Sequence, residues 1–384
     1  MDAERSNTTN SSPVLWIIAA FALLILGGLL IAETAPLILP PEASAEAQQV
    51  DNLFKILLAI GGAIFLLVQG ALVFSVIRFR ARPGDKSDGV ALHGNATLEF
   101  VWTAIPAVIV LILSIISFQV WVSTTSAKDN EMVVNVTGAR FTWSFSYAVP
   151  DHENLKVNSS TLHTYVGQSL KMVMQSADVN HAFYIPAMRI KQDLLVGRTT
   201  EIRFTPTLAG DYPVFCAELC GSGHGSMRAR IVVHPDEATY LSWFDDEVNV
   251  LLNPPADPVV RGQQILSSGQ YPCAGCHTLT ELGWTGVTGP NQNGLADRVV
   301  KTRVAATGLT PEEYLLHSLY HPSEYLVPGF GNLMPQFQAN DPNAPSYMPV
   351  EDMEAIVAYL CTLEASGENV CNLDNLQSLA SQLK

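Results

Sequence analysis

Four soft metal-binding side chains lie within one short, glycine-rich segment of the chain. Two cysteines, Cys216 and Cys220, are followed by His224 and Met227. Thiolate, imidazole and thioether groups together suit copper, whereas zinc makes no use of methionine. A single copper site of the blue type needs one cysteine, so the second cysteine favours two copper ions bridged by both sulfurs. The alternative is a Cys216–Cys220 disulfide, which leaves the neighbouring histidine and methionine unexplained.

A pair of bridged copper ions needs a second histidine, because each ion takes one imidazole and His224 supplies one. His181 lies upstream of the segment, between two runs that read as strands. Loops between the strands of small β-sandwiches commonly provide metal ligands. We therefore expect His181 to complete the site.

A second segment with clear chemistry contains Cys273, Cys276 and His277 in the order Cys-Ala-Gly-Cys-His. This is the attachment signature of c-type haem, in which two thioether bonds anchor the haem and the histidine binds the iron. A zinc or redox Cys-x-x-Cys is the alternative. A helical pattern at Pro258 to Ser268 precedes the motif, as in class I cytochromes c. Pro290, in a Thr-Gly-Pro-Asn segment, is expected to accept the free N–H of the histidine through its carbonyl group.

Two methionines could be the second axial ligand of such a haem. Met334 and Met348 each precede a proline. The segment before Met334 resembles the axial-methionine loop of cytochromes c, whereas Met348 lies just before a helical pattern and can be a packing residue. We expect Met334 to be the ligand, with Met348 as the alternative. A methionine opposite the histidine raises the potential of the iron.

The remaining cysteines, Cys361 and Cys371, are expected to form a disulfide if this part of the chain is exported. His317 and His321 are four positions apart near the end of a helical pattern and receive no metal assignment.

The net charge of −15, from 36 acidic and 21 basic residues, argues against a nucleic-acid partner. An acidic exterior suits a cationic partner, although solubility alone also explains it.

Three apolar runs precede residue 125, and each is long enough to cross a bilayer as a helix. They are Val14–Ala32, Ile56–Ile77 and Phe100–Val122. Four basic residues, Arg78, Arg80, Arg82 and Lys86, follow the second run and place that loop in the cytoplasm. The residues after about position 123 then lie outside the cell. The first run is either a third span or a cleaved signal, since Ala43-Ser44-Ala45 resembles a cleavage site.

Short β-type runs separated by turn residues follow the apolar part and predict a small antiparallel sandwich or barrel. These runs are Val133–Val136, Phe141–Tyr147, Ser169–Met174, Thr200–Phe204 and Ala229–Val233. A proline-containing linker at Asn249–Pro258 comes next. Helical patterns then cover Pro258–Ser268, Thr310–His317 and Val350–Leu363, the middle one with a capping box of Thr310 and Glu313.

The copper segment and the upstream histidine segment together resemble subunit II of cytochrome c oxidase, over roughly residues 50 to 245. The resemblance implies that Cys216 and Cys220 bridge the dinuclear copper A pair and that His181 and His224 are the terminal ligands. Met227 would be the weak ligand and Glu218 a backbone-carbonyl ligand. In this family the Glu218 side chain also reaches a magnesium or manganese ion at the subunit I interface.

Two further positions follow from the resemblance, and two positions depart from it. Trp143 matches one of the tryptophans near the copper loop, and Glu99 matches the glutamate at the cytoplasmic mouth of a proton path. The alternative for Glu99 is an acidic residue favoured by the helix dipole in a first turn. Phe141 stands where the family usually has the tryptophan that receives electrons from a soluble cytochrome, and Val196 where proline is usual.

The combined expectation is a multidomain membrane protein of the caa type. We expect an N-terminal segment with an apolar helix (1–49), a transmembrane hairpin (50–124), an all-β cupredoxin-like sandwich (125–248), a linker (249–258) and an all-α class I cytochrome c domain (259–384). The chain would lie in the plasma membrane as a multi-pass protein, with the copper and haem domains on the outer side.

The expected function is electron entry into a proton-pumping terminal oxidase, from haem c to the copper pair and then to subunit I, where dioxygen is reduced to water. Expected partners are subunits I and III, membrane lipid and an upstream donor, which is a cytochrome, a small copper protein or another respiratory complex. Alternatives are a subunit of a copper A nitric oxide reductase and a membrane-anchored carrier without an oxidase core. Nitrous oxide reductase needs a histidine-rich copper domain that nine histidines do not build, and quinol oxidases lack the copper ligands.

Overall fold

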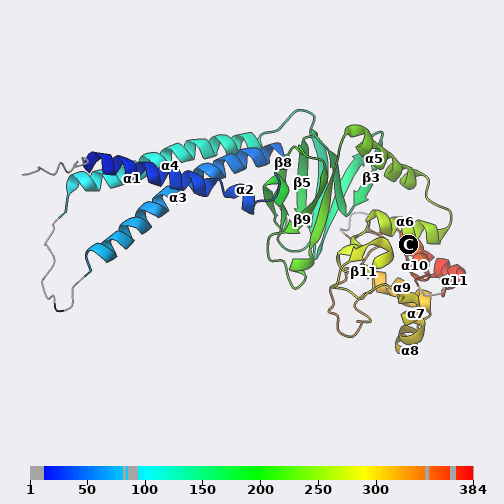
Figure 1. The fold of residues 1–384 in the computed structure, drawn as a ribbon. Coiled ribbons are helices and arrows are strands. Elements are labelled where there is room, and N and C mark those ends of the chain that lie inside the picture. The colour runs from blue at the N-terminus through cyan, green and yellow to red at the C-terminus, as the bar shows by residue number, and fades with distance from the viewer. Residues whose placement is uncertain (1–12, 81–83, 85–93, 342–345, 364–368, 384) are drawn as a thin grey trace, which may run out of the picture. The chain divides into compact units, whose positions relative to one another are not determined.

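The computed structural model describes residues 13–80, 84, 94–341, 346–363 and 369–383. The chain divides into a helical unit, residues 1–42 and 46–126, and a larger unit, residues 43–45 and 127–384. Figure 1 shows both units and labels many of their helices and strands.

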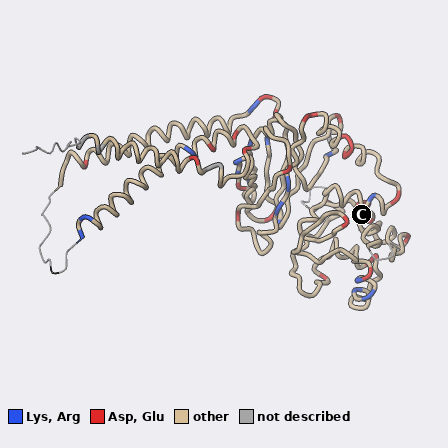
Figure 2. Tube along the Cα trace, viewed as in Figure 1, with Lys and Arg blue, Asp and Glu red and all other residues tan. Residues whose placement is uncertain are grey.

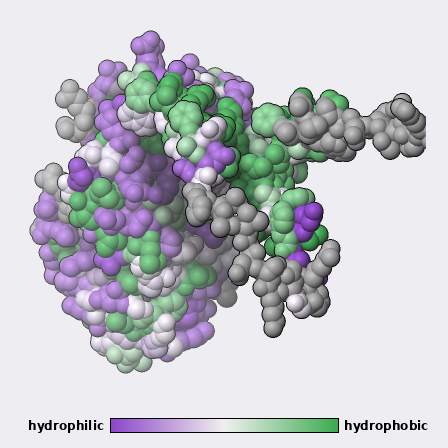
Figure 3. All heavy atoms as spheres, turned by 90° about the vertical axis from the view of Figure 1, so that its left-hand side faces the viewer, coloured by the Kyte–Doolittle hydropathy of each residue, from purple (hydrophilic) through white to green (hydrophobic). Residues whose placement is uncertain are grey.

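The described residues of the helical unit form three apolar helices and one short helix. Their bounds are α1 (Pro13–Ala32), α2 (Ala35–Ile38), α3 (Ala45–Arg78) and α4 (Ala96–Thr125). Both α3 and α4 are long and apolar enough to cross a membrane. Charged residues are sparse along them in Figure 2, and hydrophobic side chains cover them in Figure 3. The predicted apolar runs are confirmed as helices, although α3 begins before the predicted boundary at residue 50 and α4 ends at residue 125.

Glycines allow α1 to pack closely against α3. A Cβ atom on Gly28 would lie 2.3 Å from the Ala59 carbonyl oxygen and 3.1 Å from the Ala63 Cβ. A Cβ on Gly62 would lie 2.9 Å from the side chain of Ile31. Close helix contacts through small residues are a common means of helix association in bilayers. The first apolar helix therefore has a partner helix within the described part of this unit.

We expect α1 to remain in the mature protein as a third span, because its removal would expose the small residues Ala59, Gly62 and Ala63 of α3 that pack against it. Intact-mass measurement of the purified chain checks this, and the expected mass includes α1. A mature chain that begins just after Ala45 would contradict the expectation.

The larger unit begins with a sandwich of two five-stranded sheets, with strand orders β3-β2-β1-β5-β8 and β4-β10-β9-β6-β7. The strands are β1 (Met132–Ala139), β2 (Thr142–Val149), β3 (His152–Ser159), β4 (Thr161–Tyr165), β5 (Leu170–Ser176), β6 (His181–Ile185), β7 (Ile190–Leu194), β8 (Thr200–Phe204), β9 (Gly210–Cys216) and β10 (Arg228–His234). Alternate residues of β1 and β2 are buried, as a half-buried pleated strand requires. The buried side chains of both sheets form one core, which includes Val136, Phe145 and Phe183.

The predicted sandwich is confirmed, with two differences. The pairs β1–β5 and β4–β10 are parallel, so the sheets are mixed and not purely antiparallel as predicted. The strands β3, β4, β6, β7 and β9 were not predicted from the sequence.

Helix α5 (Glu237–Leu252) follows the last strand of the sandwich. Its first turn is capped by Asp236, whose side chain accepts the N–H of Thr239. Tyr240 and Phe244 on this helix belong to the core of the sandwich. Because α5 continues to Leu252, the connection before the next helix is shorter than the predicted linker of residues 249–258.

The C-terminal region has a separate core formed by helices. These are α6 (Pro258–Ser268), α7 (Leu295–Arg298), a π-helix (Val299–Arg303), α8 (Val304–Thr307), α9 (Pro311–Tyr320), α10 (Val350–Leu360) and α11 (Leu373–Ser381). Helix α6 crosses α10 closely, because a Cβ on Gly262 would lie 2.0 Å from the Ala355 carbonyl oxygen. The predicted capping box of Thr310 and Glu313 is confirmed at the start of α9. Two of the predicted helices differ in length, since α9 extends to Tyr320 and α10 ends at Leu360.

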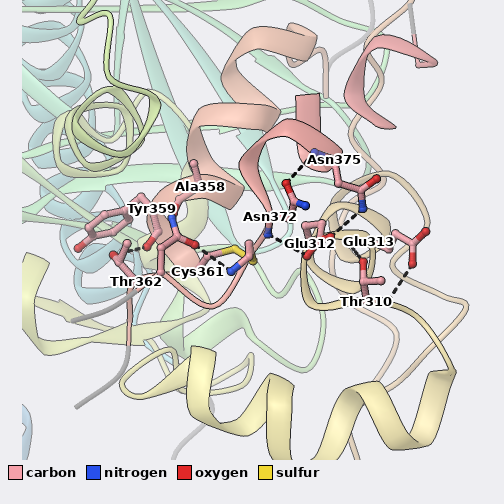
Figure 4. Close-up of a disulfide and its surroundings, with 11 residues drawn as sticks. Thr310, Glu312, Glu313, Ala358, Tyr359, Cys361, Thr362, Asn372 and Asn375 are labelled. Carbon is pink, nitrogen blue, oxygen red and sulfur yellow. Dashed lines mark hydrogen bonds between the residues drawn. A yellow bond between two sulfur atoms is a disulfide. The ribbon is translucent and has the colours of Figure 1, made fainter. Parts of the chain in front are cut away.

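Cys361 and Cys371 form a disulfide between the end of α10 and the segment that leads into α11, as predicted (Figure 4). Nearby, the buried carboxylate of Glu312 on α9 accepts the Asn375 side-chain amide at 2.7 Å and the Asn372 backbone N–H at 3.4 Å. The disulfide and these hydrogen bonds hold α11 against the rest of the helical core.

Candidate metal centres

The predicted copper ligands come together at one end of the sandwich. His181 is the first residue of β6, Cys216 is the last residue of β9, and the loop after β9 contains Cys220 and His224. Met227 immediately precedes β10. Strands β6 and β9 pair antiparallel, with Phe183 opposite Cys216, and this pairing brings His181 beside the cysteine loop.

The two thiols are placed to share metal ions and not to bond to each other. Their sulfur atoms lie 3.8 Å apart, whereas a disulfide bond is about 2.05 Å long. Each thiol has its own imidazole: the Nδ1 of His181 is 3.9 Å from the Cys216 sulfur and the Nδ1 of His224 is 3.6 Å from the Cys220 sulfur. The Met227 sulfur lies 3.8 Å from Cys220. The disulfide alternative is therefore excluded in this structure.

The pKa shifts of the two thiols favour a bound cation. Burial raises the pKa of the Cys216 thiol, but its hydrogen bonds with His181 and with the backbone outweigh burial and lower the value to about 6. Burial and the neighbouring Cys216 raise the pKa of Cys220 to about 12. The first thiolate thus opposes formation of the second. Soft cations between the sulfurs remove this repulsion, so the residues present fit a thiolate-bridged copper pair.

Asp178 orients the buried imidazole of His181. Its Oδ1 lies 2.8 Å from the His181 Nε2, and its Oδ2 accepts the Arg140 backbone N–H at 2.8 Å and the Arg140 Nε at 3.1 Å. Burial acts to raise the pKa of Asp178, but these hydrogen bonds hold it below its ordinary value. With Nε2–H donating to the carboxylate, the Nδ1 lone pair of His181 faces the thiols and is available to a metal. The sequence alone did not indicate this role of Asp178.

The remaining predicted copper-site residues lie around the loop. The Glu218 carbonyl oxygen is 3.2 Å from the Cys216 sulfur, while the residue as a whole is exposed. Trp143 is buried, with its ring centroid 6.1 Å from that of His181. Phe141 is also buried, and a Cβ on Gly223 would lie 2.3 Å from its ring. The phenyl ring thus fills the space beneath the copper loop.

The C-terminal helical region has an apolar cavity at its haem-attachment motif. Cys273, His277, Pro290 and Met334 are among its lining residues. Cys273 and Cys276 have no disulfide partner. The Nδ1 of His277 lies 2.7 Å from the Pro290 carbonyl oxygen, as the sequence predicts. A second cavity is lined by Cys276 together with Cys273, His277 and Met334. These residues are the ones that a covalently attached haem requires: two free thiols, an oriented imidazole and a thioether.

The other methionine candidate has a different setting. Met348 is fully buried in the helical core, and its backbone N–H donates to the Gln338 carbonyl oxygen at 3.0 Å. Met334 is partly buried at the cavity wall. The geometry therefore favours Met334 as a ligand and explains Met348 by packing.

Glu99, a predicted site residue, and His317, which was left unassigned, both have ordinary structural partners. Glu99 lies in the first turn of α4, where its carboxylate accepts the Asn95 N–H at 3.3 Å and completes the helix cap. His317, which received no metal assignment, pairs through Nδ1 with the Glu324 carboxylate at 2.9 Å.

Comparison with known proteins agrees with the copper site. The family model of the cytochrome c oxidase subunit II transmembrane domain matches residues 32–120, and that of the periplasmic domain matches residues 153–235. Cytochrome c oxidase subunit 2 of Thermostichus vulcanus is 34% identical over 285 residues, which cover 60% of this chain and 85% of that protein.

The chain belongs to the cytochrome c oxidase subunit II family. The subunit 2 of Alkalihalophilus pseudofirmus is 29% identical over 323 residues and is matched over 82% of this chain and 86% of its own length. Among solved structures, the periplasmic domain of subunit II of cytochrome oxidase from Bradyrhizobium japonicum is 25% identical, with a TM-score of 0.30, and covers 32% of this chain and 98% of that chain.

Membership of this family makes the chain a subunit of an oxidase complex that acts in electron transport through a copper-binding, cupredoxin-like domain. Subunit I and an electron donor are implied partners. The apolar helices and the periplasmic-domain match indicate a membrane-anchored protein with its copper domain on the outer side.

We expect Cys220→Ser to destroy the paired copper centre, because a serine oxygen is a poor bridging ligand for soft copper. Copper analysis should show a lower copper content, and electron paramagnetic resonance should lose the hyperfine pattern of an electron shared by two copper nuclei. Met227→Leu is the matched control: it removes a weak ligand and should keep both ions. A Cys220→Ser variant with full copper content and the shared-electron spectrum would contradict the assignment.

Proposed function

We propose that this oxidase subunit contains a covalent haem c in residues 259–384 and passes electrons from it to the copper pair and then to subunit I. There, dioxygen is reduced to water with proton pumping. The observation on which the proposal rests is the cavity beside Cys273, Cys276 and His277, with Met334 in its wall. The separate helical core of this region supports its reading as a cytochrome c domain.

The match to the Alkalihalophilus pseudofirmus subunit 2 also supports the proposed domain. The residues before position 259 make up about two thirds of this chain, whereas the match covers 82% of it. The similarity therefore includes part of the C-terminal helical region.

At each proposed redox site, neighbouring residues hold the ligands in their orientation. When bound, the haem and the copper pair each accept and release single electrons. Cys273 and Cys276 would anchor the haem, while Pro290 holds His277 in the orientation needed to bind iron. His181 and His224 each face a different bridging sulfur, so the two coppers would have equivalent terminal ligands.

A haem joined to the copper subunit replaces a diffusional encounter with a tethered one. Tethering raises the effective concentration of donor at acceptor, without any new contact. This explains why the chain can have Phe141 where the family usually has an electron-receiving tryptophan. The buried ring packs under the copper loop, and Trp143 packs beside His181.

The proposal includes several finer assignments. The exposed Glu218 would bind a magnesium or manganese ion at the subunit I interface, and Glu99 would open a proton path in addition to its cap. We assign the chain to the plasma membrane as a multi-pass protein, because the basic residues Arg78, at the end of α3, and Arg80, just after it, place this end of the helix on the cytoplasmic side. Subunit III is a further proposed partner.

A reduced-minus-oxidised optical spectrum of the complex, purified through a tag on this chain, tests the proposal. We expect the band of a c-type haem together with haem a bands, and more copper than this chain alone can bind. A matched Cys273→Ala, Cys276→Ala variant should lose the c-type band and keep the others. A complex with a c-type band and no haem a would indicate another reductase or a free-standing carrier. A complex without the c-type band would contradict the proposal that a cytochrome is fused to this chain.

A further inference from the structure

A glutamine side chain lies beside the free nitrogen of His277. The Nε2 of Gln292 is 2.7 Å from the His277 Nδ1 and 3.1 Å from the Pro290 carbonyl oxygen. The same Nδ1 is 2.7 Å from that carbonyl. The imidazole nitrogen opposite the iron-binding one thus has two close polar neighbours.

Binding of iron fixes the hydrogen-bond role of this imidazole. When the Nε2 of His277 binds iron, the Nδ1 is protonated and can only donate. Pro290 offers an acceptor, but an amide N–H of Gln292 at 2.7 Å would place donor against donor. The glutamine amide must therefore present its oxygen to the imidazole once the iron is bound.

Rotating the Gln292 amide gives up the 3.1 Å hydrogen bond from its Nε2 to the Pro290 carbonyl oxygen and gains one from the His277 N–H to its oxygen. The Oε1 of Gln292 is buried and has no hydrogen-bond partner among the described residues. The oxygen and nitrogen of an amide have nearly the same shape, so exchanging them requires no change in packing. After rotation, the N–H of His277 meets two acceptors, the Oε1 of Gln292 and the Pro290 carbonyl, in a three-centre hydrogen bond.

The backbone holds Gln292 in this position. Its N–H donates to the Thr278 carbonyl at 2.8 Å, and its carbonyl accepts the Leu295 N–H at 3.0 Å. On the other side of the imidazole, a Cβ on Gly289 would lie 2.7 Å from the His277 Cε1. The segment from Gly289 to Gln292 therefore wraps closely around the imidazole.

We propose that Gln292 is a positioning residue that shares the N–H of His277 with Pro290 and lowers the reduction potential of the haem. A second acceptor increases the electron donation of the imidazole and stabilises the oxidised iron. A lower potential makes the haem a stronger electron donor to the copper pair. This inference rests on the proposed function, because it requires a haem on His277.

Spectroelectrochemical titration of the purified complex tests the proposal through the c-type band. Gln292→Leu removes both acceptor and donor at similar size, and we expect the haem potential to rise. Gln292→Glu keeps an acceptor and adds negative charge, and we expect the potential to fall. Gln263→Leu is the control, because Gln263 is exposed on α6 and its amide donates to Glu281.

The potential of the copper pair in the same samples distinguishes a local effect from general damage. Opposite shifts of the haem potential in the two Gln292 variants, with the copper potential and the Gln263 variant unchanged, support the proposal. An unchanged haem potential in both variants overturns the proposal, and so do equal shifts of the haem and copper potentials. In either case the c-type band is still present, so the proposed function stands. A wild-type chain without a c-type band overturns both.

Discussion

The short distance between two buried thiols is the constraint on which the copper domain depends. At 3.8 Å, ionisation of Cys216 disfavours ionisation of Cys220 unless a cation lies between them, and the two sulfurs are too far apart for a disulfide. The fold holds them there with backbone bonds, since the Cys216 N–H donates to the Met227 carbonyl at 3.1 Å and closes the loop. Pairing of β6 with β9 then brings His181 to the first sulfur, and Asp178 fixes its ring.

The C-terminal domain orients its imidazole in a similar way. A loop folds back over His277 so that the free ring nitrogen meets fixed polar groups, Pro290 and Gln292. In both domains the proposed metal ligand is held by a second residue that is not itself a ligand. This preorganisation keeps the ligand geometry constant between oxidation states, which suits a site that transfers electrons and performs no bond chemistry.

Much of the copper site could be predicted because its ligands lie close together in the sequence. Cys216, Cys220, His224 and Met227 share one loop, so spacing alone indicated their joint role. The role of Asp178 could not be predicted, because it depends on a side-chain hydrogen bond that forms when β6 begins at His181. His181 itself was found through the family resemblance and its place between strands.

Elements with a strong local sequence pattern could be predicted. Elements that form only by pairing with another part of the chain were harder to predict. Helix α6 and the Thr310 cap have local signals, and both were predicted at the right residues. Strand β6 pairs with β9 as well as with its neighbour β7, and β1 pairs in parallel with β5, so these strands depend on partners that are distant in the sequence. The contact of Gln292 with His277 likewise requires the closed loop, and in the sequence this glutamine is one polar residue among several.

The central claim is that the haem and the copper pair of one chain exchange electrons without a mobile carrier. Flash photoreduction of the haem in the purified complex, with no added donor, measures this directly. The account predicts that the c-type band reoxidises as the copper pair becomes reduced, at a rate that does not change when the complex is diluted. A rate proportional to the concentration of the complex, or reoxidation without reduction of copper, would contradict the account.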